Sequence, residues 1–261
     1  MDRHIQSYLN QLLKSWPSKT ICLSEWFEER GISRKLVHYY NKAGWIERVG
    51  QGAYKRAGDS IDWPSGLKAL QEQANLAIHL GGKSALQLQG FAHYIPVGNI
   101  PITLYGEQQI KLPAWFNCYK WSVPIIYHST NLFGSNLNKG ISSLEVDGVQ
   151  IKASSPERAM MEMLYLIPSS QSYDEAYQIM GSLTAIRPEL TQHLLENCTS
   201  IKVKRVFMVM AKAYNYPWLK DIDKSKINFG KGKRELIKGG KLDPEFLITV
   251  PALEDKNNIE V

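Results

Sequence analysis

The stretch GISRKLVHYYNKAGWIERVGQGAYKR, residues 31–56, decides the fold expected for the N-terminal part of the chain. Within it, Ser33 stands at the N-terminal cap of a helix that runs through RKLVHYYNKA and ends at Gly44. The segments WIERV and AYKR, separated by GQG, are typical of two strands joined by a glycine turn. The stretch therefore predicts a helix followed directly by a β-hairpin.

The residues before this stretch predict two more helices and a short strand. Apolar residues recur at helical spacing over residues 3–15, and TICL at 20–23 is typical of a strand. Ser24 is expected to cap a second helix, which Gly31 ends. The order of helix, strand, helix, tight turn, helix and hairpin is that of a winged helix-turn-helix domain, here expected over residues 1–58.

The remaining residues, 59–261, predict a second domain that mixes helices and strands. Two helices interrupted at Gly81 and Gly82 are expected within residues 64–94. Strands are expected at 99–107, 117–129, 141–148, 149–155 and, with glycine turns, within 226–250; helices are expected within 154–168, 172–183, 187–199 and 201–216. The expected fold class is α+β, an N-terminal winged helix-turn-helix followed by a mixed α/β C-terminal domain.

Positive charge is concentrated in two zones of the chain. The net charge of +6 is made up of +5 over residues 1–58, −4 over 59–198, +9 over 199–241 and −4 over 242–261. Two basic zones around an acidic middle indicate contact with nucleic acid. The three cysteines lack disulfide or zinc-ligand spacing, and no segment has the apolar length of a signal peptide or a membrane span. We therefore expect a reduced, cytoplasmic protein.

The expected helix at 33–43 has an apolar side and a basic side. Leu36, Val37, Tyr40 and Ala43 are expected to face the core. In a helix-turn-helix the start of this helix meets base edges in the major groove, and a basic hairpin can lie along the backbone or in the minor groove. The alternative is a charged face that contacts only solvent. The residues expected to contact DNA are Ser33, Arg34, Lys35, His38, Tyr39, Asn41, Lys42, Arg48, Gln51, Tyr54, Lys55 and Arg56.

The basic zone at 199–241 offers a second candidate surface. Lysines next to glycines can contact phosphates. DNA, RNA and an acidic protein are alternative partners for this zone, and a solvated face without a partner is a fourth reading. Its candidate residues are Lys202, Lys204, Arg205, Lys231, Lys233 and Arg234.

The sequence does not favour an enzyme. Glu145, Asp147 and Lys152 loosely resemble part of a metal-dependent nuclease site, but the spacing from Asp147 to Lys152 is wrong for adjacent positions on one face of a strand, and no partner acid stands out upstream. FGKGKRE lacks the spacing of a Walker phosphate-binding loop. Glu157 and Arg158 are expected to be structural, with a toxin-countering surface as the alternative. We expect no catalytic residue, no metal and no cofactor.

Four segments together resemble a known family. They are SRKLVHYYNKAGWIERVGQGAYKR at 33–56, GGKSALQLQGFAHY at 81–94, ASSPERAMMEMLYLIP at 153–168 and INFGKGKRELIKGGKLDPEFLITVP at 227–251. In this combination, which covers most of the chain, the sequence resembles the AbiEi-type antitoxins of type IV toxin–antitoxin (abortive infection) systems.

The resemblance implies two activities and two partners. The N-terminal winged helix-turn-helix would bind inverted repeats in the promoter of its own operon and repress it. The C-terminal domain would neutralise a cognate nucleotidyltransferase-like toxin without a stable complex. The alternative is a protein-interaction module that docks its basic C-terminal zone on an acidic partner, without sequence-specific DNA binding.

Overall fold

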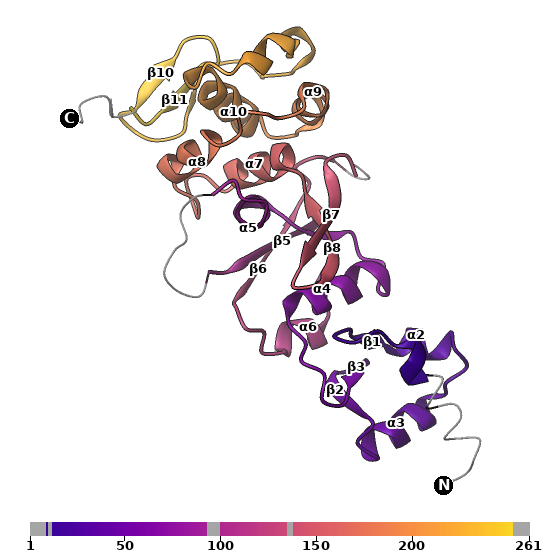
Figure 1. Ribbon diagram of the computed structural model, residues 1–261. Coiled ribbons are helices and arrows are strands. Elements are labelled where there is room, and N and C mark those ends of the chain that lie inside the picture. The colour runs from indigo at the N-terminus through magenta and orange to yellow at the C-terminus, as the bar shows by residue number, and fades with distance from the viewer. Residues whose placement is uncertain (1–8, 10–11, 93–99, 135–137, 253–261) are drawn as a thin grey trace, which may run out of the picture. The chain divides into compact units, whose positions relative to one another are not determined.

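Figure 1 shows the computed structural model, which describes residues 9, 12–92, 100–134 and 138–252. The chain forms two compact units. The first consists of residues 1–80, 98–129 and 143–152, and the second of residues 81–97, 130–142 and 153–261. Helices and strands occur in both, so this is a two-domain α+β protein. Within the described residues, no helix has both the length and the apolar character that crossing a membrane requires.

The N-terminal part of the first unit has the element order expected from the sequence. Leu9 and residues 12–15 are helical, while residues 3–8 of the expected first helix lie outside the described residues. The strands form an antiparallel sheet in the order β1-β3-β2, with α2 packed against β1 and α3 against β2. The elements are β1 (Cys22–Leu23), α2 (Ser24–Glu28), α3 (Arg34–Lys42), β2 (Ile46–Gly50) and β3 (Ala53–Arg56).

Apolar side chains from the helices and from strands β1 and β2 meet in one core. The rings of Trp16 and Phe27 pack edge to face, with centroids 5.3 Å apart. Truncating a buried side chain of this size typically costs about 3–5 kcal/mol, so the core fixes the helices firmly against the sheet. Its buried members are Leu9, Leu12, Trp16, Cys22, Phe27, Ile32, Val37, Tyr40 and Ile46.

Two details of this part differ from the sequence-based expectation. Ser24 does not cap α2, because Leu23 takes the N-cap position. The backbone N–H of Ser24 instead donates to the Gly52 carbonyl at 2.9 Å, which joins the start of α2 to the hairpin turn. Ala43 is exposed rather than in the core, because α3 ends at Lys42 and Ala43 is its C-terminal cap.

The rest of the first unit is built on a five-stranded sheet in the order β6-β5-β4-β8-β7. Helices α4 (Trp63–Glu72) and α6 (Ala114–Cys118) belong to the same unit. The Gln71 amide at the end of α4 donates to the carbonyls of Ile78 at 2.9 Å and Lys152 at 3.0 Å, which ties the helix to two strands. The strands are β4 (Ile78–Leu80), β5 (Ile102–Glu107), β6 (Ile125–Thr130), β7 (Ile141–Val146) and β8 (Val149–Ser154).

Two expectations for this region are wrong. Residues 78–80 form strand β4 rather than part of a helix. All three are buried, and a short run without an exposed side has no periodicity that separates strand from helix. The expected strand at 117–129 is also shorter, since residues 117 and 118 belong to α6 and only 125–130 form β6.

The second unit has α7 (Pro156–Tyr165) at its centre, packed against α5 (Gly82–Leu88), α8 (Tyr173–Met180), α9 (Pro188–Asn197) and α10 (Ile201–Ala213). These helices confirm the expected ones. Two 3-10 helices follow, η1 (Pro217–Asp221) and η2 (Lys224–Lys226). A three-stranded sheet in the order β10-β11-β9 closes the chain, with β9 (Arg234–Glu235), β10 (Lys241–Asp243) and β11 (Ile248–Val250).

Glu162 of α7 organises a buried polar network in the second unit. Its carboxylate accepts hydrogen bonds from the Gly82 N–H at 3.0 Å, the Ser154 hydroxyl at 2.8 Å and the Arg158 guanidinium at 2.9 Å. Glu162 is only 1% exposed and Arg158 only 8%. A buried charge needs such partners, so the network joins α5 and Ser154 to α7.

Glu157, at the start of α7, is paired in a second buried site. Its carboxylate accepts two hydrogen bonds from the Arg187 guanidinium, both at 3.0 Å. Burial raises the pKa of Glu157, but the hydrogen bonds to its carboxylate, first of all those from Arg187, together outweigh burial and hold the pKa below its usual value. The structural role expected for Glu157 and Arg158 is therefore the one their contacts support.

Candidate nucleic-acid interface

Helix α3 is positioned by its ends and by its buried side. The Ser33 hydroxyl accepts a hydrogen bond from the Leu36 N–H at 3.3 Å, as an N-terminal cap does. Gly31 precedes the helix and Gly44 follows it, with φ of +73° and +76°, which glycine adopts without strain. Val37 and Tyr40 are buried in the core, so the side that carries Arg34 is held outward.

The outward side of α3 is rich in hydrogen-bond donors. Guanidinium, ammonium and other side-chain donors on the first half of a helix are the groups that bind guanine edges and phosphate oxygens. Asn41 is half-buried. The exposed residues are Arg34, Lys35, His38, Tyr39 and Lys42.

Arg34 is oriented by a carboxylate from α2. Its Nε donates to Glu28 at 2.7 Å, and this hydrogen bond raises the pKa of Arg34. The Arg34 side chain is 84% exposed, and water and salt weaken an ion pair in such a setting. Glu28 therefore holds Arg34 at the start of α3 without closing it off from a ligand.

The hairpin presents two of its five candidate residues outward. Arg48 and Gln51 are exposed, and the Arg48 Nε donates to the Gly50 carbonyl of the same strand at 3.1 Å. The guanidinium of Arg48 keeps further donors for an anion. Arg48 and Gln51 are therefore the hairpin residues placed to contact a ligand.

The other hairpin candidates are held against the protein. Lys55 donates to the Glu47 carboxylate at 2.8 Å, and its side chain is only 16% exposed. Arg56 donates to the Trp16 carbonyl at 3.2 Å, and Tyr54 is half-buried against the core. Fewer hairpin residues are therefore exposed than the sequence predicts.

One cleft of about 540 Å³ brings the helix and hairpin residues together. Arg34 lines it from α3, and Arg48 and Gln51 line it from the hairpin. Glu25 and Glu28 of α2 contribute negative charge to the same walls. Residues 113–115, at the start of α6, close one side; they were not expected there, because no periodicity or charge in the sequence marks this short helix.

Helix α6 approaches the hairpin so closely that only glycine fits at position 50. A Cβ on Gly50 would lie 2.6 Å from the Cβ and 2.8 Å from the Cα of Trp115. We expect Gly50→Ala to lower the free energy of unfolding by about 1–3 kcal/mol, a typical cost of overpacking. Thermal melting checks this. Gln51→Ala is the control, with an expected change within about 0.5 kcal/mol, and a Gly50→Ala protein that melts like the control would contradict the close contact.

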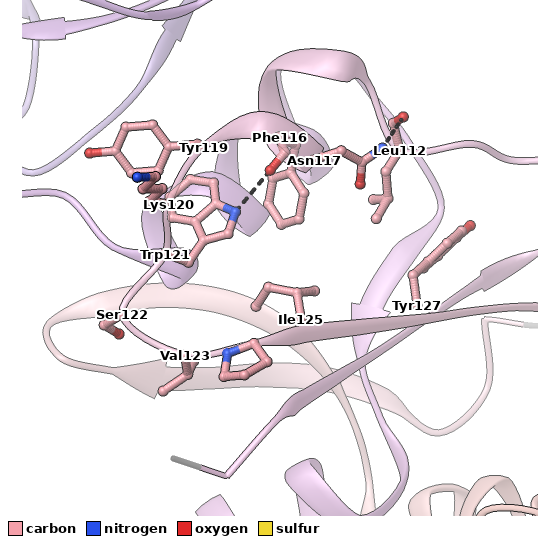
Figure 2. Close-up of a pocket in the computed structure, with 11 residues that line it drawn as sticks. Leu112, Phe116, Asn117, Tyr119, Lys120, Trp121, Ser122, Val123, Ile125 and Tyr127 are labelled. Atoms are coloured by element: carbon pink, nitrogen blue, oxygen red, sulfur yellow. Dashed lines mark hydrogen bonds between the residues drawn. The ribbon is translucent and has the colours of Figure 1, made fainter.

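A second hollow of about 540 Å³, shown in Figure 2, lies on another part of α6 and the loop after it. Phe116, Trp121 and Tyr127 give it aromatic walls. The Trp121 Nε1 donates to the Phe116 carbonyl at 2.9 Å, and the Asn117 amide to the Leu112 carbonyl at 3.1 Å. Because these donors serve the wall itself, we assign no ligand to this hollow.

The prediction of a second basic surface is wrong for some of its residues. Lys204 and Arg205 are only 3% and 1% exposed, because α10 is buried on nearly all sides and these cations face inward. Lys202 is half-buried and donates to the Tyr165 carbonyl at 2.7 Å. The expected residues that are exposed are Lys231, Lys233 and Arg234.

Comparison with known proteins defines the class. One family model, described as "Transcriptional regulator, AbiEi antitoxin, Type IV TA system", matches residues 100–251. Another, described as "Transcriptional regulator, AbiEi antitoxin N-terminal domain", matches residues 5–97. The protein is a transcriptional regulator and not an enzyme, as expected from its sequence. It belongs to the AbiEi antitoxins of type IV toxin–antitoxin systems, which confirms the resemblance.

A solved structure supports the fold independently. The crystal structure of the RV2827C protein from Mycobacterium tuberculosis matches with a TM-score of 0.61, over 95% of this chain and 92% of that chain. At 14% identity, the likeness concerns the fold alone. A search of the curated proteins found no match.

Proposed function

We propose that α2, α3 and the hairpin form a winged helix-turn-helix that binds inverted repeats in the promoter of this protein's own operon and represses it. In this proposal, residues 1–58 are the DNA-binding part. Helix α3 enters the major groove with Arg34 and Lys35 at its leading end. The hairpin is the wing, and Arg48 and Gln51 contact the backbone beside that groove.

The observation that carries the proposal is the common cleft of Arg34, Arg48 and Gln51. Two cations from separate elements converge there, and Lys35 is exposed next to Arg34. A charged face that only contacts solvent does not require such convergence. Antitoxin family membership supports the second half of the proposal, that the protein counteracts a cognate nucleotidyltransferase-like toxin.

Both halves are best tested in the full chain. Residues before 59 are tied to later ones, since the Gln73 amide donates to the Ile21 carbonyl at 2.6 Å and the Ser65 hydroxyl to the Lys19 carbonyl at 2.6 Å. A truncation near residue 59 would break these bonds and expose the core around them. Point substitutions in α3 avoid this.

The test uses a promoter reporter and growth in the presence of the induced toxin. We expect the Arg34→Ala, Lys35→Ala protein to lose repression of the reporter and to keep neutralising the toxin. Loss of both activities at an unchanged protein level would contradict the division of labour. Retained repression would contradict the role of α3.

The alternative is a module that docks its basic C-terminal zone on an acidic protein. The burial of two of its predicted cations makes this alternative less favourable. Lys204 and Arg205 are not accessible to a partner. Co-purification of the toxin through the exposed cations that remain would restore this alternative.

A further inference from the structure

Arg205 of α10 is a buried cation that organises a glycine loop of the second unit. Its guanidinium donates to the carbonyls of Phe229 and Gly232, both at 2.8 Å, of Leu247 at 2.7 Å and of Gly230 at 3.3 Å. Arg205 is 1% exposed, and no carboxylate lies within 4.0 Å of it among the described residues. The loop carbonyls therefore take the place of an acidic partner.

Because its carbonyls are directed toward Arg205, the loop presents its backbone N–H groups outward. Gly230 and Gly232 have φ of +67° and +74°, a backbone conformation that places their carbonyls toward Arg205. The N–H groups of Lys231, Gly232 and Lys233 find no acceptor within the described part of the chain. Successive free N–H groups in such a turn form a concave site for an anion.

The cations of this loop are also unneutralised. Lys231, Lys233 and Arg234 are exposed, and in the described structure no carboxylate lies within 4.0 Å of their charged groups. Two other exposed lysines of the same unit differ in this respect. Lys224 pairs with Glu245 at 2.5 Å, and Lys226 pairs with Asp223 at 3.4 Å.

We propose that the loop of residues 230–234 binds the phosphodiester backbone of a nucleic acid. Free N–H groups and ammonium groups together match phosphate oxygens. Phosphate contacts carry no base information, so this site adds affinity without sequence preference. The site lies in the second unit and does not depend on the winged helix-turn-helix assignment.

The test is binding of the full-length Lys231→Ala, Lys233→Ala protein to a short DNA duplex of random sequence, measured by fluorescence anisotropy at several salt concentrations. Each phosphate contact contributes about 0.9 to the slope of log affinity against log salt on duplex DNA. We expect the slope to fall by about 2 and the affinity at low salt to fall about tenfold. The same measurement on single-stranded RNA decides which nucleic acid the loop prefers.

Lys224→Ala, Lys226→Ala is the matched control, because it removes the same charge from the same unit at lysines that are already paired. We expect its slope to stay close to wild type. Equal effects of the two double variants, or no effect of either on both nucleic acids, would overturn the proposal. This test is independent of the test of the proposed function. The Arg34→Ala, Lys35→Ala protein is tested on promoter DNA, and it would still lose binding to that DNA if only the loop inference is wrong.

Discussion

Replacing Arg34 and Lys35 together by alanine should lower the affinity for promoter DNA at least about a hundredfold, since each removes a contact of the type that reads guanine. Both side chains are exposed at the start of α3, and neither belongs to the core that holds the helix. The fold should therefore be unchanged. Electrophoretic mobility shift on the promoter fragment measures the loss, and circular dichroism checks the fold.

A matched control separates base contacts from general charge. Lys120 and Lys152 are exposed in the first unit and belong to neither α3 nor the hairpin. Alanine at both removes the same charge, and we expect at most a few-fold loss that is equal for promoter and random DNA. If the control and the α3 variant lose affinity equally, α3 is not the recognition helix.

Glu162→Leu should be among the most destabilising single substitutions in the second unit. It removes the carboxylate that pairs with Arg158 at 2.9 Å and leaves that buried guanidinium without this partner. Breaking one side of a buried ion pair typically costs about 3–5 kcal/mol. The loss also leaves the Gly82 N–H and the Ser154 hydroxyl without their acceptor. Urea denaturation of the full chain measures the change.

The same spacing at a solvent-accessible pair gives the control. Lys68 and Glu72 form an i, i+4 pair at 3.1 Å on α4, with side chains 28% and 54% exposed. Glu72→Leu should change the free energy of unfolding by less than about 0.5 kcal/mol, as expected for a pair of this kind. If Glu162→Leu unfolds at the same urea concentration as Glu72→Leu, the buried network does not stabilise the unit.

The N-terminal elements were predictable because local signals mark both of their ends. Ser33 and Gly44 mark the ends of α3, and the GQG turn marks the hairpin. Periodicity therefore had to decide only which side of the helix is buried. The outward position of Arg34 and Lys35 followed from the burial of Val37 and Tyr40. Most residues of the candidate interface could therefore be predicted from the sequence.

Other features depend on contacts between distant segments. Nothing local indicates that the Lys55 ammonium pairs with Glu47, or that Trp115 lies against Gly50. Arg205 was expected at the surface because it is charged, and it is buried because carbonyls of residues 229–247 surround it. Ionic residues on a helix that is covered on nearly all sides can be placed only when the covering segments are known.

The proposed function requires that this protein binds DNA through α3 and the hairpin. Hydroxyl-radical footprinting of the full-length protein on its own promoter tests this most directly. We expect protection of two half-sites related by a dyad and separated by about one helical turn, about 34–36 Å, or a multiple of it, and loss of that protection in the Arg34→Ala, Lys35→Ala protein. Uniform protection along the fragment, or protection that survives both substitutions, would contradict the account.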